Sequence, residues 1–178
     1  MACVVFLRGV NVGGHRKFQP STLAKELAAF DVVNVGAAGT FVVRKTVAEG
    51  KLRAELQRRL PFEAEIMICR ASEMTELARS DLFPKATDTD ARRFVSVMAK
   101  RPRPLPRLPL SHPAGEEWQV QIVAVTGKLA LSLWRRRGKT LIYPNEVVEK
   151  RFGVPATTRN WNTIVAVCEI LGQRGSAP

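Results

Sequence analysis

The sequence predicts an α+β protein, with a ferredoxin-like βαββαβ N-terminal subdomain packed on a second, smaller α+β subdomain of mostly antiparallel strands. Three observations predict this class. Short apolar runs alternate with helical stripes in the first half, hairpin patterns dominate the second half, and five prolines separate two strand patterns in residues 101–113. We therefore expect one subdomain over residues 1–83 and another over 84–178, or one compact unit formed by both.

The first half predicts the element order β-α-β-β-α-β. Cys3–Arg8 is continuously apolar up to its last residue, which is typical of a strand covered on both faces. The clearest helix follows Thr46 and Glu49, whose spacing matches a capping box. The remaining expectations are Leu52, Leu56 and Leu60 as the stripe of that helix, an earlier helix carrying Leu23, Leu27 and Phe30, a hairpin of Val32–Val35 and Thr40–Val43 around Gly36-Ala37-Ala38-Gly39, a strand over Glu63–Cys69 and a short helix from Ser72 to Arg79.

The second half predicts strands first and helices last. The prolines of residues 101–113 exclude a helix there and favour an extended, solvated backbone. Asn145 is expected to cap a helix that ends at Gly153. The other expectations are strands over Arg93–Met98, Trp118–Val125 and Leu129–Leu133, a tight turn at Thr126-Gly127-Lys128, a short strand over Thr140–Tyr143, and a closing helix over 160–171 that buries Trp161, Ile164, Val165, Cys168 and Leu171.

The positive charge is concentrated in the second half of the chain. The 178 residues contain 28 Lys and Arg against 16 Asp and Glu, a net charge of +12. Residues 1–90 contribute +2 of this charge and residues 91–178 contribute +10. Such an imbalance indicates an anionic partner, nucleic acid first, although a solvated basic surface is the simpler interpretation. The candidate nucleic-acid-binding residues are Lys100, Arg101, Arg103, Arg135, Arg136, Arg137 and Lys139, with Arg107 in the same segment as the first three.

Composition also argues against several classes of protein. The apolar runs are too short for a transmembrane helix, and the N-terminus lacks the pattern of a secretory signal, so a cytoplasmic location is expected. Cys3, Cys69 and Cys168 are widely spaced and are expected to be reduced thiols. No cluster has metal-ligand spacing, and with only His15 and His112 a catalytic triad has few ways to form. We expect no metal or cofactor.

A glycine-rich loop follows the first strand. Its Gly9 and Gly14 have the spacing of a phosphate-binding loop, but His15 and Arg16 stand where such a loop needs Lys and Ser or Thr. Two interpretations remain: a loop whose glycines serve only the backbone, or one whose N–H groups hold an anion without hydrolysing it. The anion-binding candidates here are Arg8, Gly9, Asn11, Gly13, Gly14 and Arg16.

A second polar run, Thr157-Thr158-Arg159-Asn160, is expected at the start of the closing helix. Free N–H groups and the helix dipole favour an anion there, and Arg159 would add a bidentate contact. In the simpler interpretation Thr158 or Asn160 only caps the helix and Trp161 anchors the core. If both runs shared a cleft, an enzyme could hold a small phosphorylated or carboxylated substrate between Arg8 and Arg159, with Tyr143 or His15 carrying a proton. A partner-binding or structural protein is the third hypothesis.

Two segments carry a resemblance to a known family. Phe6-Leu7-Arg8-Gly9-Val10-Asn11-Val12-Gly13-Gly14 resembles the opening motif of the bacterial family called domain of unknown function 1697, and Thr157-Thr158-Arg159-Asn160-Trp161-Asn162-Thr163 resembles its closing motif. The resemblance implies a small cytoplasmic α+β protein and no particular reaction. The chain departs from the family at Ala38-Gly39-Thr40, where members usually have Ser-Gly-Asn, and in its proline-rich segment.

Overall fold

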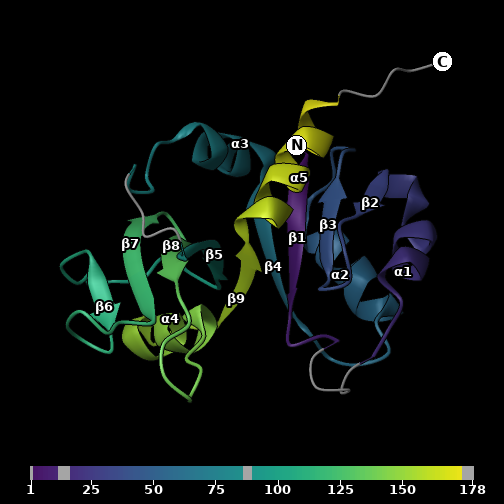
Figure 1. Cartoon of the computed structure of the whole chain (residues 1–178). Helices are drawn as coiled ribbons and strands as arrows, with labels where there is room; N and C mark the ends of the chain where they lie inside the picture. Colours follow the sequence, from purple (N-terminus) through teal and green to yellow (C-terminus); the bar gives the residue numbers. More distant parts are fainter. Residues whose placement is uncertain (1, 12–16, 86–89, 174–178) are drawn as a thin grey trace. The chain divides into compact units, whose positions relative to one another are not determined.

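The computed structural model describes residues 2–11, 17–85 and 90–173, and it has a mixed α+β architecture (Figure 1). The described part contains two antiparallel sheets and five α-helices. The chain divides into two compact units, Met1–Arg79 with Thr163–Pro178 and Ser80–Asn162. This division differs from the sequence-based proposal of 1–83 and 84–178, because residues after Asn162 belong with the first unit.

The sheet of the first unit has the strand order β2-β3-β1-β4. Its strands are β1 (Cys3–Arg8), β2 (Val32–Asn34), β3 (Thr40–Val43) and β4 (Glu65–Arg70). Every residue of β1 except Arg8 is buried, as its continuous apolar run predicts. The β-α-β-β-α-β order along the chain is as predicted, apart from a short 3-10 turn before β2. The ferredoxin-like classification stays a prediction.

The helices of the first unit are α1 (Pro20–Glu26), α2 (Glu49–Arg59) and α3 (Ala71–Arg79), and a 3-10 turn over Ala28–Phe30 follows α1. Helix α2 buries Leu52 and Leu56 as its stripe predicts. The predicted capping box is wrong, because α2 begins at Glu49 itself and Ala48 occupies the cap position without a side-chain bond. Glu49 therefore lies too early in the helix to reach back, and it accepts a hydrogen bond from Arg53 instead.

The sheet of the second unit has the order β6-β7-β8-β5-β9. Helix α4 (Pro144–Phe152) packs against it, and its Val147 and Val148 join the core formed with β5, β7 and β8. Gly153 ends α4 with φ of 63°, as predicted. The strands are β5 (Arg92–Met98), β6 (Leu110–His112), β7 (Val120–Thr126), β8 (Leu129–Trp134) and β9 (Ala156–Asn160).

Three details predicted for the second half of the chain are wrong. Thr140–Tyr143 is not a strand, because Gln119 satisfies this backbone by donating to the Thr140 carbonyl and accepting from the Ile142 N–H. Asn145 does not cap α4: Tyr143 holds the cap position and Pro144 opens the helix. The closing helix is confirmed as α5 (Trp161–Gly172), but Val165 of its predicted buried face is exposed and Val167 is buried instead.

The proline-rich segment contains no helix, as predicted, but it ends in a strand that was not predicted. Strand β6 pairs Leu110 with Ile122 and His112 with Val120 at the edge of the sheet. The residues between Met98 and Leu110 have no regular secondary structure. Ala99 donates a hydrogen bond to the Pro155 carbonyl, which fixes the start of this segment beside the turn that follows α4.

Candidate functional site

The polar side chains of the described part of the glycine-rich loop, Arg8 and Asn11, have partners within the first unit. Arg8 lies 3.0 Å from the Glu65 carboxylate, beside a pocket of about 740 Å³ that also contains Glu63. Asn11 adopts a positive φ, donates to the Ala37 carbonyl and accepts from the Phe18 N–H. The Asn of the opening motif therefore has a structural task, and two carboxylates beside one guanidinium make this pocket unsuited to an anion.

The polar run that was expected to open the closing helix is strand β9, so the predicted helix-start geometry is wrong. Thr157 is buried and accepts from Arg159, while the Thr158 hydroxyl lies 2.6 Å from that of Ser96 and donates to Asn145. β-Branched threonines suit a strand, and β9 pairs with β5 at the edge of the sheet. The N–H groups of this run are thus not the free N–H groups of a helix start. Only Asn160 is exposed.

Arg159 is buried in the fold rather than presented to solvent. Its side chain donates to the Thr157 hydroxyl at 2.8 Å and to the Thr158 carbonyl at 2.9 Å. Desolvation by burial lowers the pKa of Arg159 to about 10, so the guanidinium stays charged near neutral pH.

Several candidates of the predicted substrate cleft cannot be placed together. Gly13, Gly14, His15 and Arg16 lie outside the described residues. Gly9 has φ of 67°, the left-handed conformation that its backbone role predicts. Arg8 belongs to the first unit and Arg159 to the second. A cleft that uses both arginines stays a prediction.

The three consecutive arginines after β8 have different environments. Arg135 is 7% exposed, lies 3.9 Å from the centre of the Trp118 ring and donates to the carbonyls of Trp118 and Glu116. Arg137 is half-buried and forms an ion pair with Asp90 at 2.7 Å. Arg136 and Lys139 are exposed. Of this predicted cluster, only Arg136 and Lys139 present side chains to solvent without an ion pair among the described residues; we call these two the loop cations.

The basic residues of the proline-rich segment are all exposed. They are Lys100, Arg101, Arg103 and Arg107, which we call the segment cations. The register of the sheet places Lys100 and Arg101 just beyond Met98, at one end of β5, and Arg136 beyond Trp134, which pairs with Arg92 at the other end. At about 3.3 Å per residue, the six steps of β5 separate Lys100 and Arg101 from Arg136 by about 20 Å.

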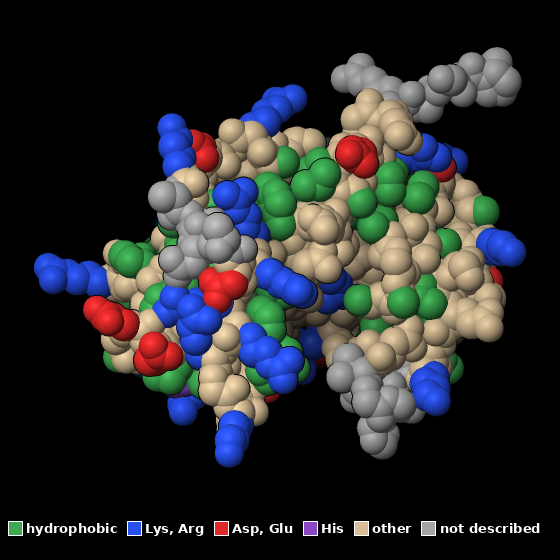
Figure 2. Space-filling model, in the orientation of Figure 1, with side chains coloured by type: hydrophobic (Ala, Val, Ile, Leu, Met, Phe, Trp, Pro, Cys, Tyr) green, Lys and Arg blue, Asp and Glu red, His purple; other side chains and the backbone are tan. Residues whose placement is uncertain are grey.

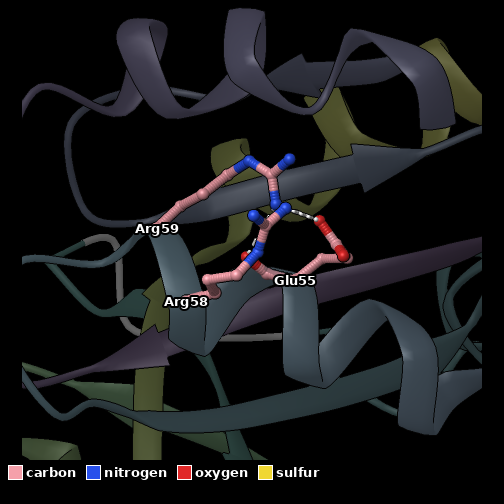
Figure 3. A network of polar contacts seen from close by, with 3 residues as sticks. All are labelled: Glu55, Arg58 and Arg59. Carbon is pink, nitrogen blue, oxygen red and sulfur yellow. Dashed lines mark hydrogen bonds and ion pairs between the residues drawn. The ribbon is translucent and has the colours of Figure 1, made fainter.

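The two units differ in how their cations are compensated. In the first unit, arginines form ion pairs with described acidic residues: Arg8 with Glu65, Arg44 with Asp31, Arg53 with Glu49, and Arg58 and Arg59 with Glu55. Figure 3 shows the last of these networks, in which hydrogen bonds from Arg58 and Arg59 lower the pKa of Glu55. Between described residues of the second unit, ion pairs join Lys85 to Asp81 and Arg137 to Asp90. None involves a loop or segment cation.

A pocket that sequence reasoning missed lies in the second unit. It measures about 360 Å³ and is lined by side chains from β6, from the segment before α4, and from α4 itself. The only sequence signal was the spacing of Glu146 with Lys150 on one side of a predicted helix, and nothing in the sequence joined these residues to His112. The lining residues are His112, Ile142, Glu146, Val147, Lys150 and Arg151.

Other kinds of site have little support in the described chain. Within residues 2–11, 17–85 and 90–173, no three metal-ligating side chains form a group that could hold a metal ion. All three cysteines are free thiols, and burial raises the pKa of Cys3 and of Cys168. No helix in the same ranges combines the length and the apolar character needed to cross a membrane.

The fold and these surfaces define a two-unit α+β protein whose second unit carries the loop cations and the segment cations. The sequence model of a family described as "Protein of unknown function (DUF1697)" matches residues 1–125, and the chain belongs to this family. A solved structure of a conserved bacterial protein from Streptococcus pneumoniae is similar, with a TM-score of 0.57 and 16% identity over 96% of this chain and 98% of that one. This likeness supports the α+β fold. No curated protein matches the sequence.

Proposed function

We propose that the protein binds a polyanion, namely nucleic acid, through the exposed cations of its second unit. The observation that supports this proposal is that the segment cations and the loop cations have no ion-pair partner among the described residues, whereas the first unit pairs most of its arginines. An uncompensated cation on a protein surface is available to displace counterions from a phosphate backbone, which is the main source of affinity for nucleic acid.

The spacing of the two groups favours an extended partner. About 20 Å between them is too far for one phosphate group to contact both, but it corresponds to about six phosphates along one strand of a duplex. Figure 2 shows one face of the molecule. The blue side chains of Lys and Arg gather over the part of that face formed by the second unit, with fewer red side chains of Asp and Glu among them. Apart from Trp134, which directly precedes the arginine run, no aromatic residue stands among residues 100–107 or 134–139 of the sequence, so the contacts expected are to phosphates rather than to bases.

The test is fluorescence anisotropy with a labelled 24-base-pair duplex, repeated across salt concentrations. If all six cations contact phosphates, the logarithm of the affinity should fall against the logarithm of salt with a slope of about −5. Replacing the loop cations in R136A/K139A, or two segment cations in K100A/R101A, should each reduce the slope to about −3.5.

The matched control is K25A/K45A, which removes two exposed lysines of the first unit. This variant lowers the net charge by the same amount but touches neither group of cations, so its slope should equal that of the wild type. An equal reduction of the slope in all three variants would show that binding follows net charge alone, and an unchanged slope in R136A/K139A and K100A/R101A would show that these cations do not contact the duplex. Lack of binding at low salt would exclude the proposed function.

A further inference from the structure

The pocket between β6 and α4 combines an apolar floor with a charged rim. Val147 is 3% exposed and belongs to the core of the second unit, and Ile142 packs against that core. The other lining residues are polar or charged: His112, Glu146, Lys150 and Arg151. A volume of about 360 Å³ is within the range of small-molecule sites, which are mostly apolar with a few convergent polar groups.

The charges of the rim select the class of ligand. Lys150 and Arg151 supply two positive charges, and Glu146 supplies one negative charge. The C-terminal end of α4 adds a partial negative charge of about half a unit, which offsets part of the remaining positive charge. Although Glu146 and Lys150 are one helical turn apart, they form no ion pair, and neither Lys150 nor Arg151 pairs with another described acid. The rim therefore keeps a positive balance toward a ligand, and His112 adds a hydrogen-bond donor from the opposite side.

We propose that this pocket binds a small phosphate monoester, with the phosphate held by His112, Lys150 and Arg151 and the organic group on Ile142 and Val147. A dianionic head suits two cations and one imidazole donor better than a monoanion does. An apolar body suits the aliphatic floor, whose contacts an inorganic ion would leave unused. The site uses neither the loop cations nor the segment cations, so it goes beyond the proposed binding of nucleic acid.

The experiment follows the imidazole resonances of His112 by NMR at pH 7.5 during titration with phenyl phosphate. The chain has two histidines, so the variants H15N and H112N assign the signals. Phenyl phosphate should shift the His112 signal with a dissociation constant on the order of 1 mM. Inorganic phosphate and phenol, each of which supplies half of the ligand, should bind at least about tenfold more weakly, since each lacks one set of contacts.

Charge variants test the rim. K150A should weaken the binding of phenyl phosphate about fivefold or more by removing a charge-assisted contact. E146Q should strengthen the binding of phenyl phosphate about two- to threefold, because it removes a negative charge that repels the phosphate. K139A, which removes a loop cation, should leave it unchanged while weakening duplex binding, and so separates this proposal from the proposed function. Unshifted His112 signals, equal binding of all three probes, or equal binding by K150A would each overturn the proposal.

Discussion

At the scale of single residues, two neighbouring arginines differ in burial and therefore in function. Arg135 and Arg136 are adjacent in one basic run, yet Arg135 is buried against Trp118 and Arg136 is exposed. Successive side chains of an extended segment point to opposite sides, so Arg135 can pack against Trp118 while the next side chain, Arg136, faces solvent. The sequence showed the charges, but the alternation became meaningful only once Trp118 and the 113–119 turn were placed against the end of β8.

This difference predicts opposite effects of mutation. Arg135→Ala should lower the free energy of unfolding by about 2–4 kcal/mol, because it removes the guanidinium that the carbonyls of Glu116 and Trp118 accept from, together with a contact to the Trp118 ring. Arg136→Ala should change it by no more than about 0.5 kcal/mol. Urea denaturation of both variants measures this. Equal destabilisation would show that Arg135 does not fix the turn.

Glu55 predicts a pH dependence of stability. Hydrogen bonds from Arg58 and Arg59 lower the pKa of Glu55 in the folded protein below its ordinary value of 4.5, which we take for the unfolded chain. Between the folded and the unfolded pKa, the folded protein therefore binds fewer protons than the unfolded chain. The stabilisation is therefore present above pH 4.5 and is lost as the pH falls through the folded value. Glu55→Gln should lower the urea midpoint at pH 7 but lose this difference from the wild type near pH 2.5. Glu117→Gln, an exposed carboxylate outside the network, should match the wild type at both pH values.

At the scale of elements, the first sheet was the most predictable part of the fold. The apolar runs of β1 and β3 and the stripe of Leu52 and Leu56 reflect burial, which sequence periodicity reports directly. Cap positions were less predictable, since the chain offers several polar residues near each helix start and tertiary contacts select one. Asn145 could have capped α4, but it accepts from Thr158 of β9 instead. This hydrogen-bond partner of Asn145 lies 13 residues further along the chain, so the sequence around the helix start does not indicate it.

The same limit applies to the candidate sites. The polar run that contains Thr157 and Arg159 is compatible with a helix start and with a strand. Its pairing with Val97 and Val95 of β5 shows that it is a strand. The pocket of His112 and Lys150 joins segments nearly forty residues apart, which no spacing pattern reports. In contrast, the segment cations were predictable as exposed, because prolines keep their backbone out of a helix and in contact with water.

The turn between β2 and β3 tests how closely the first sheet is packed. Gly36 and Gly39 both have a positive φ, of 72° and 71°. A Cβ on Gly36 would meet nothing within 4 Å, whereas one on Gly39 would lie 2.8 Å from Val10 and 2.9 Å from Leu7, both buried. Gly36→Ala should therefore cost about 1 kcal/mol of backbone strain, and Gly39→Ala about 2–4 kcal/mol because overpacking is added. Thermal unfolding of the pair measures the difference, and equal costs would show that β1 yields to the added methyl group.

At the scale of the whole molecule, the net charge of +12 includes cations that form ion pairs and cations that do not. The arginines of the first unit mostly serve local ion pairs on its own elements, and exposed pairs of this kind contribute little to stability. The loop cations and the segment cations of the second unit have no such pairs among the described residues, so their charge acts outward. The overall balance is thus a poor guide to binding, and the distribution of pairing partners is a better one.

The distance between the two groups of cations gives the last prediction. If one duplex contacts both groups, the losses of binding free energy in R136A/K139A and K100A/R101A should add in the fourfold variant to within about 0.5 kcal/mol, because the groups are about 20 Å apart and share no partner. Titration at high duplex concentration should give one duplex per protein for every variant. Two duplexes bound to the wild type and one to each double variant would instead show two independent sites, and an extended partner bridging the unit would be excluded.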